Sequence, residues 1–102
     1  MPLQATYIEE EERLDLSFAG NLDVTLTGDI CHVCSQVPCG LRACIVDLSN
    51  VQRIFDSGVA LLQMLYRRLT KLGTTVVILA EHPDVRACVP MIMQAPAPAQ
   101  AA

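Results

Sequence analysis

The sequence contains no tryptophan, and its aromatic side chains are two tyrosines and two phenylalanines, 4% of the 102 residues. A chain with so few large rings builds its core from aliphatic, methionine and cysteine side chains. It also lacks the aromatic rings on which nucleic-acid bases stack. Because 52% of the residues are nevertheless hydrophobic, we expect one domain with a core of its own.

Positive charge is also scarce. Seven Lys and Arg residues against eleven Asp and Glu residues give a formal net charge of -4, and four consecutive glutamates occupy positions 9–12. The sequence therefore has no basic patch for a nucleic-acid backbone or an anionic membrane. We expect a protein partner and no nucleic acid.

Long apolar runs are missing too. No stretch reaches 18 apolar residues, and the start MPLQATYIEEEERL has neither the basic beginning nor the apolar run of a signal peptide. We therefore expect no insertion into a membrane and a cytoplasmic location. Five cysteines, an odd number, favour reduced thiols over a disulfide framework.

The hydrophobic pattern of the first forty residues predicts two strands and a helix. A short β-prone piece at 6–8 and an alternating segment around 14–18 flank the glutamate run, which is expected to be a solvated hairpin connection. Apolar residues then recur at helical spacing and stop before Pro38 and Gly40. These apolar residues are Leu26, Ile30, Val33 and Val37.

The remaining pattern predicts strands and helices in alternation. Two unbroken apolar runs, residues 43–46 and 75–80, predict strands buried on both faces, and residues 47–50 supply a turn. Helical spacing over 58–72 ends in cations and Gly73, a typical helix terminus. A short helix is predicted from Pro83 to about Val89, ending before Pro90.

Together these elements predict the fold class. Helices alternating with strands indicate an α/β domain over residues 1–93, with a mixed, largely parallel sheet of four to five strands and three to four helices. Residues 94–102, rich in Ala and Pro, are expected to be disordered.

The segment IFDSGVALL, residues 54–62, places an acid, a hydroxyl and a glycine between apolar runs. It follows the strand at 43–46, and functional loops of open α/β folds lie at the carboxyl ends of strands. Asp56 or Ser57 is expected to be the N-cap of the following helix, and Gly58 would let another chain's backbone approach closely. A well-capped helix with no further role is the alternative interpretation.

The run from Cys44 to Val89, CIVDLSNVQRIFDSGVALLQMLYRRLTKLGTTVVILAEHPDVRACV, resembles the STAS domain family, which includes bacterial anti-sigma factor antagonists. Members have a strand ending in Asp-Leu-Ser, then Asp-Ser-Ser-Gly or Asp-Ser-Ala-Gly before an apolar helix, and a last short helix opened by Pro and Val-Arg. The preceding Gly-Asn-Leu-Asp at 20–23 is similar to the family's Gly-x-Leu-Asp turn. The resemblance covers roughly residues 5 to 89. Its matching positions are Asp47, Leu48, Ser49, Gly58, Gly73, Pro83, Asp84, Val85 and Arg86.

In that family a kinase phosphorylates the first Ser after the Asp and so switches off binding. Counted back from Gly58 without a gap, Asp56 takes the position of that Ser, with Phe55 before it and Ser57 after it. The resemblance then implies a fixed negative charge where a phosphate would be. If one residue is deleted instead, Asp56 is the family's Asp and Ser57 the phosphoacceptor. We favour the gapless alignment, because it keeps the spacing from Asp47 into the helix.

The resemblance implies a protein-binding module without enzymatic activity or a cofactor. Its partner would be an anti-sigma factor of the serine kinase type, contacted by Phe55, Val59, Asn21 and Asp23, with Asp23 beside the 56–58 loop. The alternative is a small STAS subunit of a lipid-transport ABC system that binds its ATPase. A nucleotide or small-molecule sensor is a third hypothesis.

Three further features have simpler interpretations. Cys31 and Cys34 have C-x-x-C spacing, but no second knuckle completes a zinc site, so core packing of Cys34 and Cys44 is favoured over a metal or redox role. His82 is expected to be a capping or exposed residue. The segment Met-Ile-Met at 91–93 is expected to cover bare surface or to mediate a homodimer.

Overall fold

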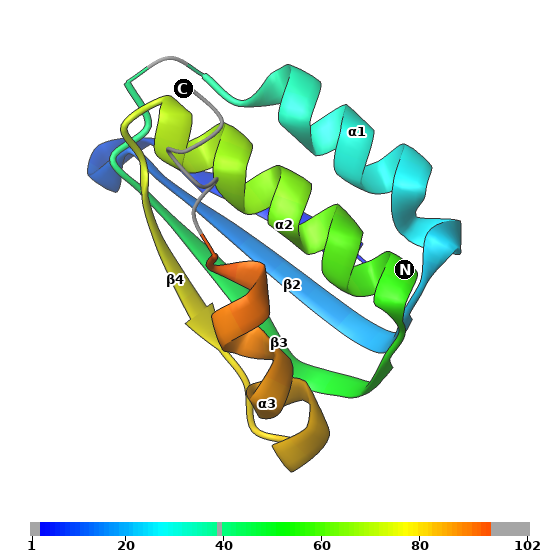
Figure 1. The fold of residues 1–102 in the computed structure, drawn as a ribbon. Coiled ribbons are helices and arrows are strands. Elements are labelled where there is room, and N and C mark those ends of the chain that lie inside the picture. Colours follow the sequence, from blue (N-terminus) through cyan, green and yellow to red (C-terminus); the bar gives the residue numbers. More distant parts are fainter. Residues whose placement is uncertain (1–2, 39, 95–102) are drawn as a thin grey trace, which may run out of the picture.

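The computed structural model describes residues 3–38 and 40–94, which form a single α/β domain. Two 3-10 turns, η1 (Glu9–Glu11) and η2 (Val24–Leu26), precede β2 and α1. The predicted fold class and the order of strands and helices are confirmed. In chain order the elements are β1 (Leu3–Ile8), β2 (Arg13–Leu22), α1 (Thr27–Gln36), β3 (Ala43–Ile54), α2 (Asp56–Lys71), β4 (Thr75–Leu79) and α3 (Pro83–Ile92), as Figure 1 shows.

The four strands form one mixed sheet in the order β1-β2-β3-β4. β1 and β2 are an antiparallel hairpin, as predicted, and Arg13 after the turn binds Asp15 at 2.9 Å and Glu11 at 3.2 Å. The pairs β2–β3 and β3–β4 are parallel, with Cys44 opposite Leu14 on one side and Val76 on the other. The sheet is therefore largely parallel, as the alternation of helices and strands predicts.

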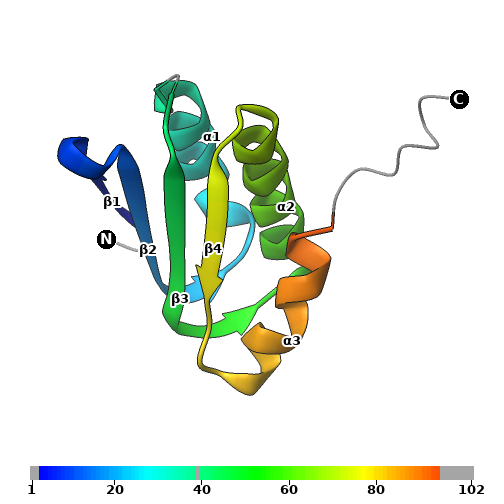
Figure 2. The same ribbon diagram turned by 90° about the vertical axis from the view of Figure 1, so that its left-hand side faces the viewer.

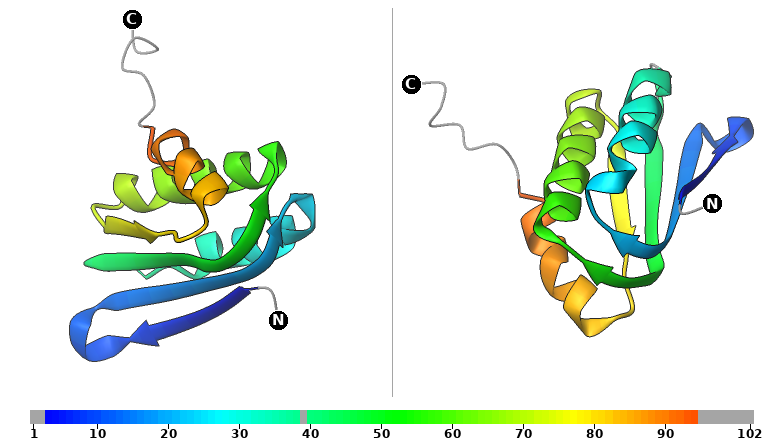
Figure 3. Two further views of the ribbon diagram at one scale, coloured as in Figure 1. Left: turned by 90° about the horizontal axis from the view of Figure 1, so that it is seen from below. Right: turned by 90° about the vertical axis from the view of Figure 1, so that its right-hand side faces the viewer.

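The three α-helices of the described residues lie on one face of this sheet (Figure 2; seen from below in Figure 3). The sheet grows in one direction from β2 to β4, so two crossovers of the same hand place α1 and α2 on the same side. Alternate side chains of the strands point to the helices and form the core. Its largest fully buried members include Leu16, Phe18, Leu22, Leu48, Leu62, Leu65 and Leu69.

The prediction that β3 and β4 are buried on both faces is wrong, because none of the helices in the described residues covers the opposite face. Val77 and Leu79 of β4 remain 40% and 46% exposed, whereas Cys44 and Val46 of β3 point to the helices and are buried. An apolar run predicts a strand, but the placement of the crossovers decides how many faces are covered.

The prediction of a turn at residues 47–50 is also wrong, because β3 continues to Ile54. The turn-forming residues act inside the strand instead: the Asp47 carboxylate accepts hydrogen bonds from the Ser49 amide at 2.9 Å and its hydroxyl at 2.6 Å. The pairing with β2 shifts here, since Ser17 lies opposite Asp47 but Ala19 opposite Asn50. Such a bulge bends a strand, and the end of β3 turns towards α2 (Figure 2).

The helix predicted from the stripe of Leu26 to Val37 is α1, with Ile30 and Val33 buried. The helix predicted over 58–72 is α2, which begins two residues earlier. Its N-cap is Phe55, whose side chain makes no capping hydrogen bond, so the prediction that Asp56 or Ser57 is the N-cap is wrong. Both residues lie in the first turn.

α3 runs from Pro83 through Pro90 to Ile92, so the predicted end before Pro90 is wrong. Proline removes one helical hydrogen bond, but buried Val85 and Ile92 anchor the helix on both sides of it. The Gln63 amide of α2 also donates to the Met91 carbonyl at 2.8 Å. The predicted disordered tail, apart from Gln94, lies outside the described residues.

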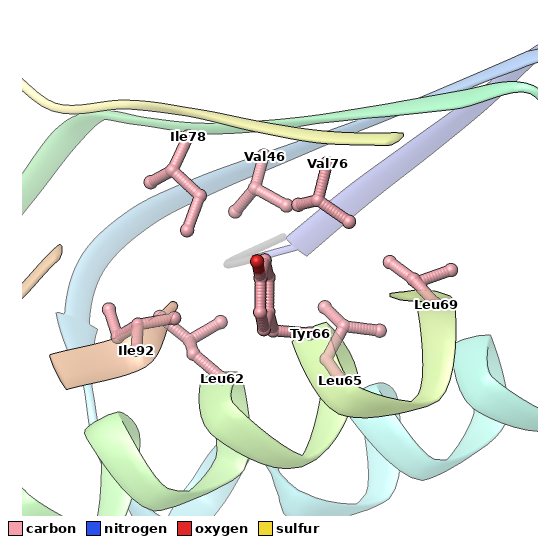
Figure 4. A pocket seen from close by; sticks show the side chains of 8 residues that line it. All are labelled: Val46, Leu62, Leu65, Tyr66, Leu69, Val76, Ile78 and Ile92. Atoms are coloured by element: carbon pink, nitrogen blue, oxygen red, sulfur yellow. The ribbon is translucent and has the colours of Figure 1, made fainter. Parts of the chain in front are cut away.

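Figure 4 shows a cavity between α2, α3 and the sheet, into which Tyr66 points. Its volume of about 10 Å³ is the space of roughly one water molecule, so it cannot hold a nucleotide. The cavity is lined by Val46, Leu62, Leu65, Tyr66, Leu69, Val76, Ile78 and Ile92. α3 thus completes the core.

No helix among the described residues combines the length and the apolar character that crossing a membrane requires.

Candidate functional site at the start of α2

The site lies where β2 and β3 end side by side and the chain enters α2. Leu22 and Ile54 are the last paired residues of the two strands, and the Phe55 amide donates to the Leu22 carbonyl at 2.9 Å. Parallel strands bring their carboxyl ends to one edge of a sheet. The structure therefore brings the Gly-Asn-Leu-Asp segment at 20–23 next to the 55–58 loop.

Gly58 fixes the distance between these two segments. A Cβ atom at Gly58 would lie 2.4 Å from the Leu22 carbonyl oxygen and 2.7 Å from its carbonyl carbon, which is closer than real Cβ atoms come. The prediction that this glycine admits another chain's backbone is therefore corrected: the backbone that approaches is the chain's own. Gly58 is buried and lets α2 begin directly against β2.

The side chains before Gly58 point outward. Phe55 is 41% exposed, Asp56 is exposed in the first turn of α2, and Ser57 is partly buried. A carboxylate in this position interacts favourably with the positive end of the helix dipole. The Arg53 guanidinium lies over the Phe55 ring, 6.0 Å from its centroid, so a cation lies beside the exposed aromatic ring.

Asn21, near the end of β2, and Asp23, just after β2, lie next to the 55–58 loop. Asn21 is exposed and pairs with Arg53 in the sheet register. Asp23 is the N-cap of η2, where its carboxylate accepts hydrogen bonds from the Thr25 hydroxyl and from the Thr25 amide at 3.0 Å. The hydroxyl, with a smaller contribution from the amide, holds the pKa of the Asp23 carboxyl below its usual value.

Val59 does not belong to this surface. It was predicted to supply apolar contact to a partner, but it is 7% exposed and packs in the core, so this prediction is wrong. The exposed apolar residue next to Asp23 is instead Val24, which is 65% exposed at the beginning of η2.

Two exposed residues were missed by sequence reasoning. Val24 is an apolar residue outside the helical stripe that starts at Leu26, and this position could have indicated that it is exposed. No sequence pattern pointed to Arg53, because residues 47–50 were predicted to be a turn that ends the strand. We call Asp23, Val24, Arg53, Phe55 and Asp56 the α2-start surface.

Cys44 and His82 have the structural roles predicted for them. Cys44 is fully buried, and burial, with a smaller effect of Asp15, raises the pKa of its thiol to about 12. His82 caps α3, its Nδ1 accepting from the Asp84 amide at 3.2 Å. Within residues 3–38 and 40–94, no three His, Cys, Asp or Glu side chains are grouped as a metal site.

Comparisons with known proteins match the fold but not the sequence. No protein-family model matches the chain, and no curated protein does. The anti-sigma factor antagonist SpoIIAA in its unphosphorylated form matches with a TM-score of 0.65 at 17% identity, over 93% of this chain and 87% of its own. An anti-sigma factor antagonist STAS domain from Rhodobacter sphaeroides matches with a TM-score of 0.63 at 14% identity, over 87% and 91%. The chain has a STAS-like fold.

The STAS-like fold also matches part of a larger protein. A crystal structure of Mglu matches with a TM-score of 0.64 at 24% identity, over 74% of this chain. The chain spans only 18% of the length of that Mglu structure. The two anti-sigma factor antagonists, by contrast, match over most of both chains, which agrees with the resemblance based on Asp47, Gly58 and Gly73.

Proposed function

We propose that this chain is a non-enzymatic, protein-binding regulatory module of the bacterial cytoplasm whose α2-start surface docks on an anti-sigma factor of the serine kinase type. The main support is that Phe55 and Asp56 are exposed on a backbone fixed by the contact of Gly58 with Leu22. The likeness to two anti-sigma factor antagonists supports the class of partner.

Asp56 has a specific part in this proposal. It occupies the position of the phosphorylatable serine in the gapless alignment, so the surface is charged without a kinase. A phosphoserine has a charge of about -1.5 to -2 and three acceptor oxygens, whereas a carboxylate has a charge of -1. The module would then have one binding state, set by its sequence.

The charge of Asp56 also constrains the partner. Burying a carboxylate in an apolar contact costs desolvation free energy unless a cation faces it. Arg53 offers one cation from this chain, beside Phe55. We expect the partner to contribute a second cation opposite Asp56 and an apolar pocket for Phe55 and Val24.

A pull-down from lysate of the native host tests this proposal. Tagged wild type is compared with Asp56→Ser, and bound proteins are identified by mass spectrometry. The matched control is Asp84→Ser, which removes an exposed acid from the first turn of α3. We expect the wild type and Asp84→Ser to recover the same kinase-type anti-sigma factor, and Asp56→Ser to recover a changed amount of it.

Other results would contradict the proposal in distinguishable ways. Recovery of an ABC transporter ATPase regardless of Asp56 would favour the structural subunit. A stoichiometric phosphate on Ser57, detected by intact-mass measurement of protein from the host, would favour the alignment in which Ser57 is the phosphoacceptor.

A homodimer is a separate part of the proposal. Ile92 is buried in the chain's own core, but Met91 and Met93 are 52% and 36% exposed at the end of α3. Exposed apolar side chains favour association. Size-exclusion chromatography with light scattering at micromolar concentration should give the dimer mass for the wild type and the monomer mass for Met91→Ser with Met93→Ser. A wild-type monomer would exclude the dimer.

A further inference from the structure

Three sulfur-containing side chains line one hollow between α1 and α2. They are Cys31 and Cys34 of α1 and Met64 of α2, and Ser35 and Arg68 line the hollow with them. Cys31 and Cys34 are three residues apart, and Met64 and Arg68 are four residues apart. Either spacing places the two residues of a pair on the same side of their helix. α1 packs against α2, and these residues of both helices line the hollow between them.

The exposure of these sulfurs is unusual. Cysteine is among the residue types most often buried, and Cys44 of the same chain is fully buried. Cys31 is nevertheless exposed and Met64 is 41% exposed. Cys34 is partly buried and packs against the core, as predicted. Core packing, which explains Cys44, does not explain a cysteine and a methionine that both face solvent in one hollow.

The chemistry of this group is that of a soft metal site. Thiolate and thioether sulfur select soft ions such as Cu(I), whereas structural zinc takes four ligands, chiefly from Cys and His. Met64 supplies the thioether ligand beside the two thiols. We propose that Cys31, Cys34 and Met64 form a three-sulfur site for one Cu(I) ion.

The charges of the site agree with a monovalent ion. Each thiol loses its proton to solvent as its sulfur binds the metal, and copper stays Cu(I), so no oxidant or reductant is consumed. Two thiolates, one Cu(I) and the Arg68 guanidinium then sum to zero. A Zn²⁺ ion in the same place would leave a net positive charge and an unfilled fourth position.

Competition with a chromophoric Cu(I) chelator, under anaerobic conditions with reduced full-length protein, tests the proposal. A Cys39→Ser background removes a further thiol from the measurement. We expect the protein to withhold one equivalent of Cu(I). Because loss of even an outer-shell partner weakens metal binding about 10–100-fold, we expect Cys31→Ser and Cys34→Ser to weaken it by at least about 100-fold and Met64→Leu by about 10-fold.

Matched controls separate the site from general sulfur binding. Met91→Leu removes another exposed methionine and Cys88→Ser another partly buried cysteine, both on α3, and both should bind Cu(I) as the starting protein does. Copper X-ray absorption should show three sulfur neighbours, and two in Met64→Leu. Unchanged affinity in Cys31→Ser, or unchanged affinity and coordination in Met64→Leu, would overturn the proposal.

Discussion

The two ends of α2 are held in different ways. At its beginning, Phe55 makes no side-chain capping bond, and the helix is positioned by the contact of Gly58 with the Leu22 carbonyl. At its end, Gly73 adopts a φ of +84°, and the Thr74 amide donates to the Leu69 carbonyl at 3.0 Å. A left-handed residue with such a bond is the usual local end of a helix.

The beginning of α2 is thus held by a tertiary contact, whereas its end is set by a local sequence signal. The end of α2 depends on residues adjacent in sequence, so Gly73 and the preceding cations predict it. The beginning depends on a strand more than thirty residues away, which no local pattern reveals. The exposed Phe55 and Asp56 lie at the end that tertiary structure holds, and changes at the two ends should therefore differ in size.

The largest effect is expected for Gly58→Ala. The added methyl group meets backbone atoms of Leu22, which cannot move without shifting β2. We expect the free energy of unfolding to fall by about 3 kcal/mol, the upper end of overpacking costs. Urea denaturation followed by circular dichroism measures this loss.

The matched control is Gly28→Ala in α1. Nothing lies within 4 Å of the position that a Cβ would take there. Alanine is the better helix former, so this variant should be more stable than the wild type by about 0.5–1 kcal/mol. Equal effects of the two substitutions would mean that the contact of Gly58 with Leu22 does not position α2.

A smaller effect is expected at the other end of α2. Gly73→Ala introduces a Cβ at a positive φ in open space, which costs about 1–2 kcal/mol. Gly73→Asn should cost less, because asparagine tolerates this conformation. Thermal unfolding of the three proteins measures the order. A loss for Gly73→Ala greater than that for Gly58→Ala would reverse the comparison.

Asp56→Asn should change stability least among the substitutions in α2. The carboxylate is exposed, and its interaction with the helix dipole amounts to about 0.3–1 kcal/mol at low salt. The loss should shrink in high salt, since exposed charges are screened. Urea denaturation at two salt concentrations tests this, and a salt-independent loss above that range would mean that Asp56 has a structural role.

Asp23 allows a comparison of two helix starts within the site. η2 begins with a side-chain cap, whereas α2 has none. Hydrogen bonds from Thr25 lower the pKa of Asp23 in the folded state, so its ionised form stabilises the fold. That contribution is complete above about pH 4 and is lost as the pH falls through the lowered pKa. The stability difference between wild type and Asp23→Asn should therefore be larger at about pH 6 than at about pH 3. A constant difference would contradict the shift.

Most of the fold could be predicted because its signals are local. The alternation of Leu14, Leu16 and Phe18, the stripe of α1 and the glycine after α2 each depend on neighbouring residues. Two of the errors concern β3, where Asp47 forms a bulge rather than a turn, and α3, where Pro90 is accommodated. In both cases hydrogen bonding or burial beyond the local segment overrides the preference of the residue.

The candidate site was predicted in position but not in detail. The order of motifs placed Asp56 and Gly58 at the start of a helix and Asp23 nearby. The burial of Val59 and the exposure of Val24 depend on how η2 and α2 pack, which a single sequence does not specify. Likewise, Met64 lines the same hollow as Cys31 and Cys34 only because two helices pack together.

The parallel pairing of the sheet has a consequence for how the chain folds. The β1–β2 hairpin joins residues as close as Ile8 and Arg13, whereas Cys44 pairs across about thirty residues with both Leu14 and Val76. Closing such loops is slow, so we expect the hairpin to form first and assembly of β2, β3 and β4 to limit the rate. Stopped-flow refolding of Val46→Ala, a core residue of β3, should therefore be slower than that of the wild type.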